Sequence, residues 1–415
     1  MINKKIGILT LGLALVSLAS CGGNGGDKRP VLTFCGPDSD EVFLKGLAEE
    51  FNAAHKEDLD YRFEFDKIIG EGEVKTEVLK DVTAAPDVVL LADDNIRDLV
   101  AANAIVEWTA EETNAMIAQS GATAVGSMQL KGKTYGIPYR GDNGYQLIYD
   151  KDLVTADDVK SLEGLLAKAK ENGWKVGYNF TDAWYVPAPF FANGVKIEYN
   201  ANDEFVCDIA SSGKGVEVMM HYSQLWNDYK DTIVNEAQGN NFGPSAGVNR
   251  KCAQIIWNAY GTVRDAIGED KVGVAQLPTV RLGGVDKQLY TYAGYKGAGV
   301  INKGRDAAAV SAAKEFVKFI TNTANQEKRL VKLEHGVTDA TVVAKTELWN
   351  NPFLNSLAAQ QVAGKSVVQA THARQTWWDA GKTLMETVLN QEAVMTEDEA
   401  KAALLICETA VLKND

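Results

Sequence analysis

The first third of the chain alternates between predicted strands and predicted helices. Residues 31–34 form a short apolar run, which is typical of a buried strand. Apolar residues then recur at helical spacing, at Val42, Phe43, Leu47 and Phe51. The pattern continues with a strand exposed on one side, a helix, a buried strand and a second helix, over residues 59–65, 74–82, 87–92 and 95–108. This alternation predicts a parallel sheet with helices on its faces.

The remainder of the chain predicts a second α/β unit. Residues 158–171 have a helical pattern, and residues 175–178 are a predicted strand. Two segments that contain Gly and Pro, residues 135–153 and 272–288, are predicted to cross between the units. The last third is mostly helical. With 415 residues the chain is longer than a single core usually organises, so we expect two domains.

The N-terminus has the pattern of an export signal. A basic segment, residues 1–5, precedes an apolar run that is too short to span a bilayer comfortably. The run ends in Leu-Ala-Ser-Cys at residues 18–21, which resembles the lipobox of bacterial lipoproteins. This implies a lipoprotein signal peptide over residues 1–21, with lipidation on Cys21, followed by a flexible tether over residues 22–30. We expect a location outside the cytoplasm, with a lipid anchor in the cell membrane; an ordinary secretory signal with a chance cysteine is the alternative.

Charge and composition argue against several classes of function. The formal net charge is −14, and no basic run follows the extreme N-terminus, so no nucleic-acid partner is expected. The four histidines are scattered and no cysteine pair has CxxC spacing, so neither a metal site nor another cofactor is expected. The sequence leaves open whether thiols or disulfides form at Cys35, Cys207, Cys252 and Cys407.

Three local patterns contain residues that could take part in ligand binding or catalysis. Asp38 and Asp94 follow predicted strands, and ligands of parallel α/β sheets bind beyond the carboxyl ends of strands. Residues 243–247 fit G-x-S-x-G, but a polar loop precedes them and a strand follows, so no nucleophile elbow is predicted. Two adjacent tryptophans, Trp377 and Trp378, open a helical pattern and point about 100° apart.

Five segments in order resemble the bacterial extracellular solute-binding proteins, and most closely the maltose- and maltodextrin-binding branch. They are residues 86–96, 135–154, 178–194, 273–279 and 376–400, beginning PDVVLL, YGIPYR, YNFTDA, GVAQLP and TWWDAG. The resemblance implies an α/β, two-lobed fold of the periplasmic-binding-protein type (type II, Venus-flytrap) with a ligand cleft between the lobes. It places lobe 1 at residues 30–141 and 290–337, and lobe 2 at residues 142–289 and 338–415.

The same resemblance implies a set of ligand-binding residues: Asp38, Asp94, Asn95, Asp142 or Asn143, Asp182, Trp184, Tyr260, Trp377 and Trp378. Several ligand-binding residues of the family are replaced in this chain. Ser39 and Asn95 stand where the family has lysine and arginine, Leu91 stands where it has tryptophan, and a late arginine is absent near Gly381. The five segments therefore agree with the family better than the ligand-binding residues do, and the particular sugar is left open.

These residue types suit a neutral polyol. Carboxylates accept several strong hydrogen bonds from hydroxyl groups, and flat aromatic rings cover the C–H faces of a sugar. On a helical wheel Trp377 lies with the core residues, and Trp378 lies on the shoulder, where it can stack on a sugar ring.

We therefore expect the monomeric substrate-binding lipoprotein of an ABC sugar importer. It would bind a maltodextrin-like oligosaccharide and deliver it by hinge closure to the permease subunits. The alternatives are a secreted glycoside hydrolase, which would need two carboxylates flanking one bond, and a binding protein for another sugar or solute.

Overall fold

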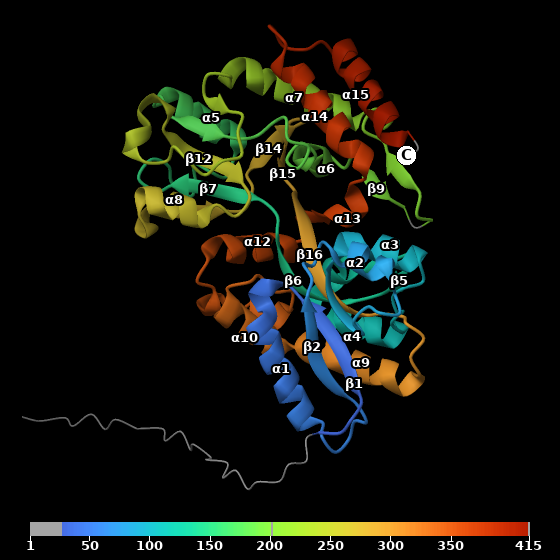
Figure 1. The fold of residues 1–415 in the computed structure, drawn as a ribbon. Helices are drawn as coiled ribbons and strands as arrows, with labels where there is room; N and C mark the ends of the chain where they lie inside the picture. Colours follow the sequence, from blue (N-terminus) through green and yellow to red (C-terminus); the bar gives the residue numbers. More distant parts are fainter. Residues whose placement is uncertain (1–26, 201, 414–415) are drawn as a thin grey trace, which may run out of the picture.

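The computed structural model describes residues 27–200 and 202–413, and it contains two α/β lobes stacked one above the other (Figure 1). Lobe 1 is defined here by the first large sheet and lobe 2 by the second. This confirms the predicted fold class. Within the described ranges, no helix is both long and apolar enough to cross a membrane.

The sheet of lobe 1 has the order β17-β16-β3-β1-β2, and β6 also pairs with β16. Its strands are β1 (Val31–Gly36), β2 (Arg62–Ile68), β3 (Val88–Ala92), β6 (Ile137–Asn143), β16 (Thr291–Val300) and β17 (Ser366–Val368). β1 is parallel to β2 and β3, whereas β16 is antiparallel to β3 and β6. All five residues of β3 are buried because helices cover both faces of the sheet.

The helices of lobe 1 follow the predicted alternation with one difference. They are α1 (Glu41–Ala54), α2 (Val74–Lys80), α3 (Ile96–Ala101), α4 (Ala110–Ser127) and α9 (Ala307–Ile320). Phe63 of β2 stacks on Phe316 of α9 with ring centroids 4.2 Å apart, which joins the sheet to this helix. The helix predicted over residues 95–108 is shorter than expected, because the chain turns at Asn103, whose φ is +53°.

The sheet of lobe 2 has the order β11-β8-β12-β7-β13. Its strands are β7 (Gln146–Asp150), β8 (Lys175–Gly177), β11 (Ile233–Val234), β12 (Lys251–Ile256) and β13 (Val272–Ala275). The surrounding helices are α5 (Leu162–Glu171), α6 (Ala188–Ala192), α7 (Lys214–Tyr229), α8 (Tyr260–Ile267), α14 (Gln375–Leu389) and α15 (Glu397–Leu412). Ser245 lies in a 3-10 segment, Pro244–Asn249, and not at a strand-to-helix turn, so the predicted absence of a nucleophile elbow is confirmed.

Three small two-stranded sheets complete the lobes. They are β4 (Gln129–Leu130) with β5 (Lys133–Thr134), β9 (Ile197–Tyr199) with β10 (Phe205–Cys207), and β14 (Thr279–Leu282) with β15 (Val285–Gln288). The four cysteines in the described ranges are free and buried, and burial raises the thiol pKa values of Cys35, Cys207 and Cys252 to about 12. They are therefore unreactive thiols near neutral pH. Cys21 and its signal peptide lie outside the described residues.

The chain crosses between the lobes from β6 to β7, from β15 to β16, and again after β17 through α13 (Gln369–His372) (Figure 1). The first crossing is tight at Gly144. A Cβ there would lie 2.7 Å from Leu357 Cδ1 and 2.8 Å from the Tyr292 carbonyl oxygen, so a side chain would force the backbone to move. Helices α10 (Thr323–Leu333), α11 (Ala340–Val343) and α12 (Pro352–Val362) lie beside the crossings, and α12 contacts strands of both large sheets.

Candidate functional site

Strand direction determines which loops line the cleft between the lobes. β7 starts just after the first crossing, and its first residue, Gln146, pairs with Ile256 at the carboxyl end of β12. β8 runs parallel to β12, so both strands direct their carboxyl ends toward lobe 1. In lobe 1 the carboxyl ends of β1, β2 and β3 point toward lobe 2. The loops that follow these five strands therefore face each other.

One polar pocket of about 360 Å³ lies between the two lobes. Lobe 1 contributes Asp94 from the 3-10 turn Asp93–Asn95 after β3, together with Lys75 and Arg97. Lobe 2 contributes Trp378 at the start of α14 and Tyr199 of β9. Two residues predicted from sequence, 284 positions apart, thus line the same pocket.

Asn95 positions Asp94 rather than facing the pocket. It is fully buried, and its Nδ2 donates to the carbonyl oxygens of Ala92 and Glu71 and to Asp94 Oδ1, at 3.1, 3.2 and 2.9 Å. Its Oδ1 accepts from the backbone N–H of Lys75 at 2.7 Å. These bonds use both the donor and the acceptor of the Asn95 amide. Asn95 could therefore contact a ligand directly only if some of these bonds broke.

A row of aromatic rings runs along the lobe 2 side of the site. Tyr292 of β16 lies between Trp184 and Trp378, with centroid distances of 5.0 and 6.4 Å. Asp182 precedes Trp184 in the loop after β8, and its Oδ1 accepts from the Trp184 backbone N–H at 2.9 Å. Trp184 and Trp378 are half-buried, which leaves part of each ring available for contact.

The two adjacent tryptophans have different surroundings. Trp377 is fully buried in the core of lobe 2, and its Nε1 donates to the Ala183 carbonyl oxygen at 3.0 Å. Trp378 is directed toward the pocket. The division expected from the helical wheel, with Trp377 in the core and Trp378 on the shoulder, is confirmed; its role in sugar stacking stays a prediction.

Asp38 and Asp142 lie at the lobe 1 edge beside a charged network. Asp38 is exposed, in the 3-10 turn Asp38–Asp40 after β1. Asp142 accepts from Arg140 Nε at 2.5 Å, and Arg140 also lies 3.5 Å from Glu71 Oε1. Deeper in this edge, buried Asp40 pairs with buried Arg329. The edge therefore combines exposed Asp38 with Asp142, whose carboxylate is paired with the cationic side chain of Arg140.

Asn143 and Tyr260 differ from the other predicted residues. Asn143 is exposed at the end of β6 and pairs with Gly294 beside the first crossing. Tyr260 is only 7% exposed and lies in an apolar cluster with Phe242, Ile256 and Trp349. The structure does not place Tyr260 in the pocket that contains Asp94 and Trp378.

Three residues at the lobe edges were missed by the sequence analysis. Glu71 follows β2, Arg140 lies near the end of β6, and Trp257 follows β12 directly. Trp257 is 52% exposed, and its Nε1 donates to the Ala237 carbonyl oxygen at 3.2 Å. A large aromatic directly after a buried strand was the available signal for Trp257, and the position after a strand was the signal for Glu71.

Contacts between the lobes close one side of the pocket. Arg97 of α3 forms an ion pair with Asp203, and its guanidinium carbon lies 3.7 Å from the centroid of the Tyr199 ring. Lys131 Nζ lies 3.8 Å from Asp203 Oδ2. These contacts hold the hairpin formed by β9 and β10 against lobe 1.

Asp93, next to Asp94, is a buried carboxyl group with an altered pKa. Burial raises its pKa from 3.8 to about 7, although its Oδ2 accepts from the Tyr295 backbone N–H at 2.9 Å. The unfolded chain releases this proton near pH 4, whereas the folded protein keeps it up to about pH 7. Raising the pH from about 4 to about 7 therefore lowers the free energy of unfolding. Above about pH 7 this group causes no further loss of stability.

We expect Asp93→Asn to remove this pH dependence. Between pH 5 and pH 8 the wild type should lose on the order of 2 kcal/mol more stability than the variant. Urea unfolding at both pH values measures the difference. Asp157→Asn, at a well-exposed surface carboxylate, is the control and should follow the wild type. Equal slopes for wild type and Asp93→Asn would contradict the assignment.

The sequence matches the family described as bacterial extracellular solute-binding protein over residues 46–355, and the chain belongs to this family. Proteins of this family bind solutes outside the cytoplasm. The comparison with curated proteins gave no match.

Solved structures of sugar-binding proteins share the fold. A maltodextrin-binding protein from L. casei BL23 has a TM-score of 0.78 at 21% identity, covering 93% of this chain and all of that one. A solute-binding protein from Staphylococcus aureus in complex with maltose has a TM-score of 0.74 at 17% identity, covering 92% and 97%. A chain solved with acarbose has a TM-score of 0.69 at 26% identity, covering 92% and 98%. The predicted resemblance to this class of protein is confirmed.

Proposed function

We propose that this protein is the substrate-binding component of an ABC sugar importer and that it binds a maltodextrin-like oligosaccharide between its lobes. The observation that carries the proposal is the pocket in which Asp94 of lobe 1 meets Trp378 of lobe 2. The similar structures, a maltodextrin-binding protein and chains solved with maltose and with acarbose, support the choice of sugar.

The chemistry of the cleft fits a neutral sugar. Asp38, Asp94, Asp142 and Asp182 can accept hydrogen bonds from hydroxyl groups, and Arg140 can donate to them. Trp184 and Trp378 can cover sugar faces, and half-exposed Trp257 extends this aromatic surface along the lobe 2 edge. The pocket contains Lys75 and Arg97 as well as carboxylates, so its charges do not favour an ionic ligand of either sign.

Contacts from both lobes would couple binding to hinge closure. A ligand shifts the equilibrium between open and closed states only if it binds one of them better. A sugar held by Asp94 and Trp378 together gains its contacts when the lobes approach, and the closed form would be the one that engages the permease as a monomer. The hinge would lie at the three crossings, between β6 and β7, between β15 and β16 and at α13, and the third crossing comes later in the chain than the boundary predicted at residue 338 because β17 pairs with β16 in the lobe 1 sheet.

The N-terminal segment completes the proposal. Lipidation at Cys21 and a Gly-rich tether over residues 22–30 would hold the folded part near the membrane that contains the permease. Mass spectrometry of the protein purified from its own membrane would detect acyl chains on Cys21.

Titration with maltose, maltotriose and a longer maltodextrin tests the proposed function. Calorimetry should give micromolar dissociation constants, about −8 kcal/mol, together with a change in tryptophan fluorescence. The sugar should be recovered intact. Shorter products released from maltotriose would favour a glycoside hydrolase instead, and an absence of binding to all three sugars would overturn the assignment to maltodextrins.

A further inference from the structure

Trp257, at the lobe 2 edge of the cleft, is exposed but held in place. It follows β12 directly, and the pairing of β12 with β7 places it at the edge of lobe 2 that faces lobe 1. The residue is 52% exposed. Its backbone N–H donates to the Tyr185 hydroxyl oxygen at 3.4 Å, and its indole Nε1 donates to the Ala237 carbonyl oxygen at 3.2 Å. The fold therefore presents a flat ring to solvent and restricts its rotation.

A buried lysine fixes the loop to which the indole is bonded. Lys251 of β12 is fully buried, and its Nζ donates to the Gln238 carbonyl oxygen at 2.9 Å and to Asn240 Oδ1 at 3.1 Å. Both acceptors lie in the loop after β11 that carries Ala237. A buried ammonium group is costly without such partners, so the loop is constrained to supply them. A side chain fixed in this way loses little conformational entropy when it binds a ligand.

Buried tyrosines join Trp257 to the row of aromatic rings on the lobe 2 side. The ring centroids of Tyr185 and Tyr145 are 4.9 Å apart, and those of Tyr145 and Trp184 are 6.0 Å apart. Because both tyrosines are buried, Trp184 and Trp257 are the accessible rings of this series. Among the described residues, Trp257 is not one that lines the pocket with Trp378. The aromatic surface thus continues beyond that pocket.

The free side of the cleft is the side of Trp257. Ion pairs of Arg97 and Lys131 with Asp203 join lobe 1 to the hairpin of β9 and β10 and close the other side. Figure 1 shows β9 and α8 on opposite sides of lobe 2, and Trp257 precedes the first residue of α8 by three positions. An oligosaccharide longer than the pocket is therefore expected to extend toward Trp257 and away from the hairpin.

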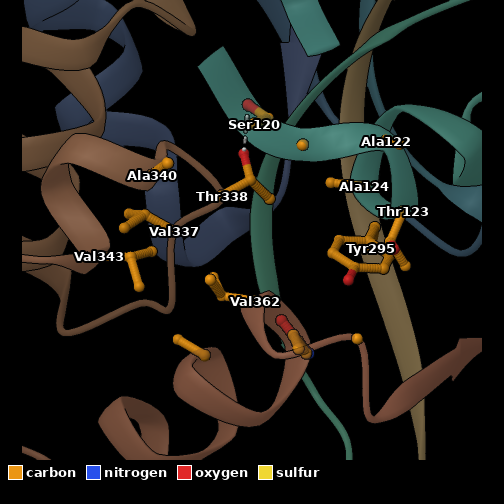
Figure 2. A pocket seen from close by; sticks show the side chains of 14 residues that line it. Ser120, Ala122, Thr123, Ala124, Tyr295, Val337, Thr338, Ala340, Val343 and Val362 are labelled. Atoms are coloured by element: carbon orange, nitrogen blue, oxygen red, sulfur yellow. Dashed lines mark hydrogen bonds between the residues drawn. The ribbon is translucent and has the colours of Figure 1, made fainter. Parts of the chain in front are cut away.

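A second hollow in the molecule does not offer these contacts. It has a volume of about 180 Å³ and lies between α4 and α12 (Figure 2). None of the described residues that line it is charged, its aromatic ring, Tyr295, is buried, and aliphatic side chains such as Val337 and Val343 surround it. It lacks both a carboxylate and an exposed ring, so an additional sugar unit finds its contacts at Trp257 instead.

We propose that Trp257 is a specificity-determining residue that forms an additional subsite, where a glucose unit beyond those held at Trp378 and Trp184 stacks on the indole face. This inference rests on the proposed function, and it implies a preference for long oligosaccharides over disaccharides. Indole rings cover the C–H faces of sugars, and a fixed ring does so at a low entropic cost. The resemblance placed this aromatic at Tyr260, which is only 7% exposed in an apolar cluster, so the role passes to Trp257.

Calorimetric titration with maltose and maltohexaose tests the subsite. The wild type should bind maltohexaose about tenfold more tightly than maltose, and in Trp257→Ala this ratio should fall to about one, because stacking on one ring is worth roughly that factor. An unchanged ratio, or a wild type that binds both sugars equally, would overturn the subsite and leave the proposed function standing. If the wild type binds neither sugar, the proposed function fails and the subsite fails with it.

A matched variant and a spectroscopic measurement separate stacking from a structural role. Trp174→Ala removes the same side chain at the opposite edge of the lobe 2 sheet and should keep the wild-type ratio. Trp257→Phe keeps a ring and should retain part of the preference. In NMR spectra of the ¹⁵N-labelled protein, the Trp257 Nε1 signal, assigned by its loss in Trp257→Phe, should shift much more with maltohexaose than with maltose. Equal shifts with the two sugars would contradict stacking on this ring.

Discussion

Replacing both Asp94 and Trp378 by alanine is expected to weaken oligosaccharide binding by two to three orders of magnitude. Asp94 would lose charge-assisted hydrogen bonds, worth about 1.5–3 kcal/mol, and Trp378 would lose ring stacking of comparable size. The two side chains come from different lobes and line one pocket, so the double variant removes a contact on each side of the cleft. Calorimetric titration of the single and double variants measures the loss and its additivity.

A matched control keeps the change in composition and moves it away from the cleft. Trp174 lies just before β8, at the edge of the lobe 2 sheet opposite the cleft, and Asp157 is a well-exposed surface carboxylate. Their double replacement by alanine should leave the affinity within about twofold of wild type, because it removes no cleft contact. If the Asp94 and Trp378 variants also bind like the wild type, the pocket is not the sugar site.

Trp377→Ala should destabilise the protein by about 3–5 kcal/mol, whereas Trp378→Ala should cost much less stability. Trp377 is fully buried, and Gly381 one turn later leaves room for its ring: a Cβ on Gly381 would lie 2.9 Å from Trp377 Cζ2. Truncation would therefore leave a large cavity and an unpaired carbonyl oxygen at Ala183. Urea unfolding of the two variants measures the difference.

Two further measurements make this prediction specific. Trp377→Phe should recover part of the lost stability, because it refills most of the cavity without restoring the bond to Ala183. Trp378→Ala should combine near-native stability with weakened sugar binding. Equal stability losses in Trp377→Ala and Trp378→Ala would show that the burial of the two rings has been assigned wrongly.

Local periodicity accounts for the prediction of Asp94 and Trp378, the two predicted residues that line the pocket between the lobes. Helical geometry sends adjacent side chains in different directions, so Trp377 and Trp378 could be divided between core and pocket without tertiary information. Asp94 follows a fully buried run of five residues, Val88–Ala92, and such runs end at the ligand-binding edge of α/β sheets. Both inferences depend on neighbours within a few positions along the chain.

The residues that were placed differently depend on distant neighbours. In the sequence, Asn95 is a polar residue next to a carboxylate. In the structure, its side-chain amide is buried and forms hydrogen bonds with the Glu71 carbonyl oxygen and the Lys75 N–H. Tyr260 was expected in the cleft, yet helices from the last hundred residues, with Trp349 and Phe353, complete an apolar cluster around it. Trp257, three positions earlier, holds the exposed position instead.

By itself the sequence determined the alternation of strands and helices, the class of fold, the acidic and aromatic character of the cleft and the division between Trp377 and Trp378. Only the tertiary structure decided which strand ends meet, because pairing such as β16 with β3 joins residues some two hundred positions apart. Together with the pairing of β16 with β6 and of β1 with β2, this pairing brings Glu71 and Arg140 to the same edge of lobe 1, and the pairing of β12 with β7 places Trp257 at the facing edge of lobe 2. Periodicity reports which side of an element is apolar, and the order of strands in a sheet determines which polar ends share a site.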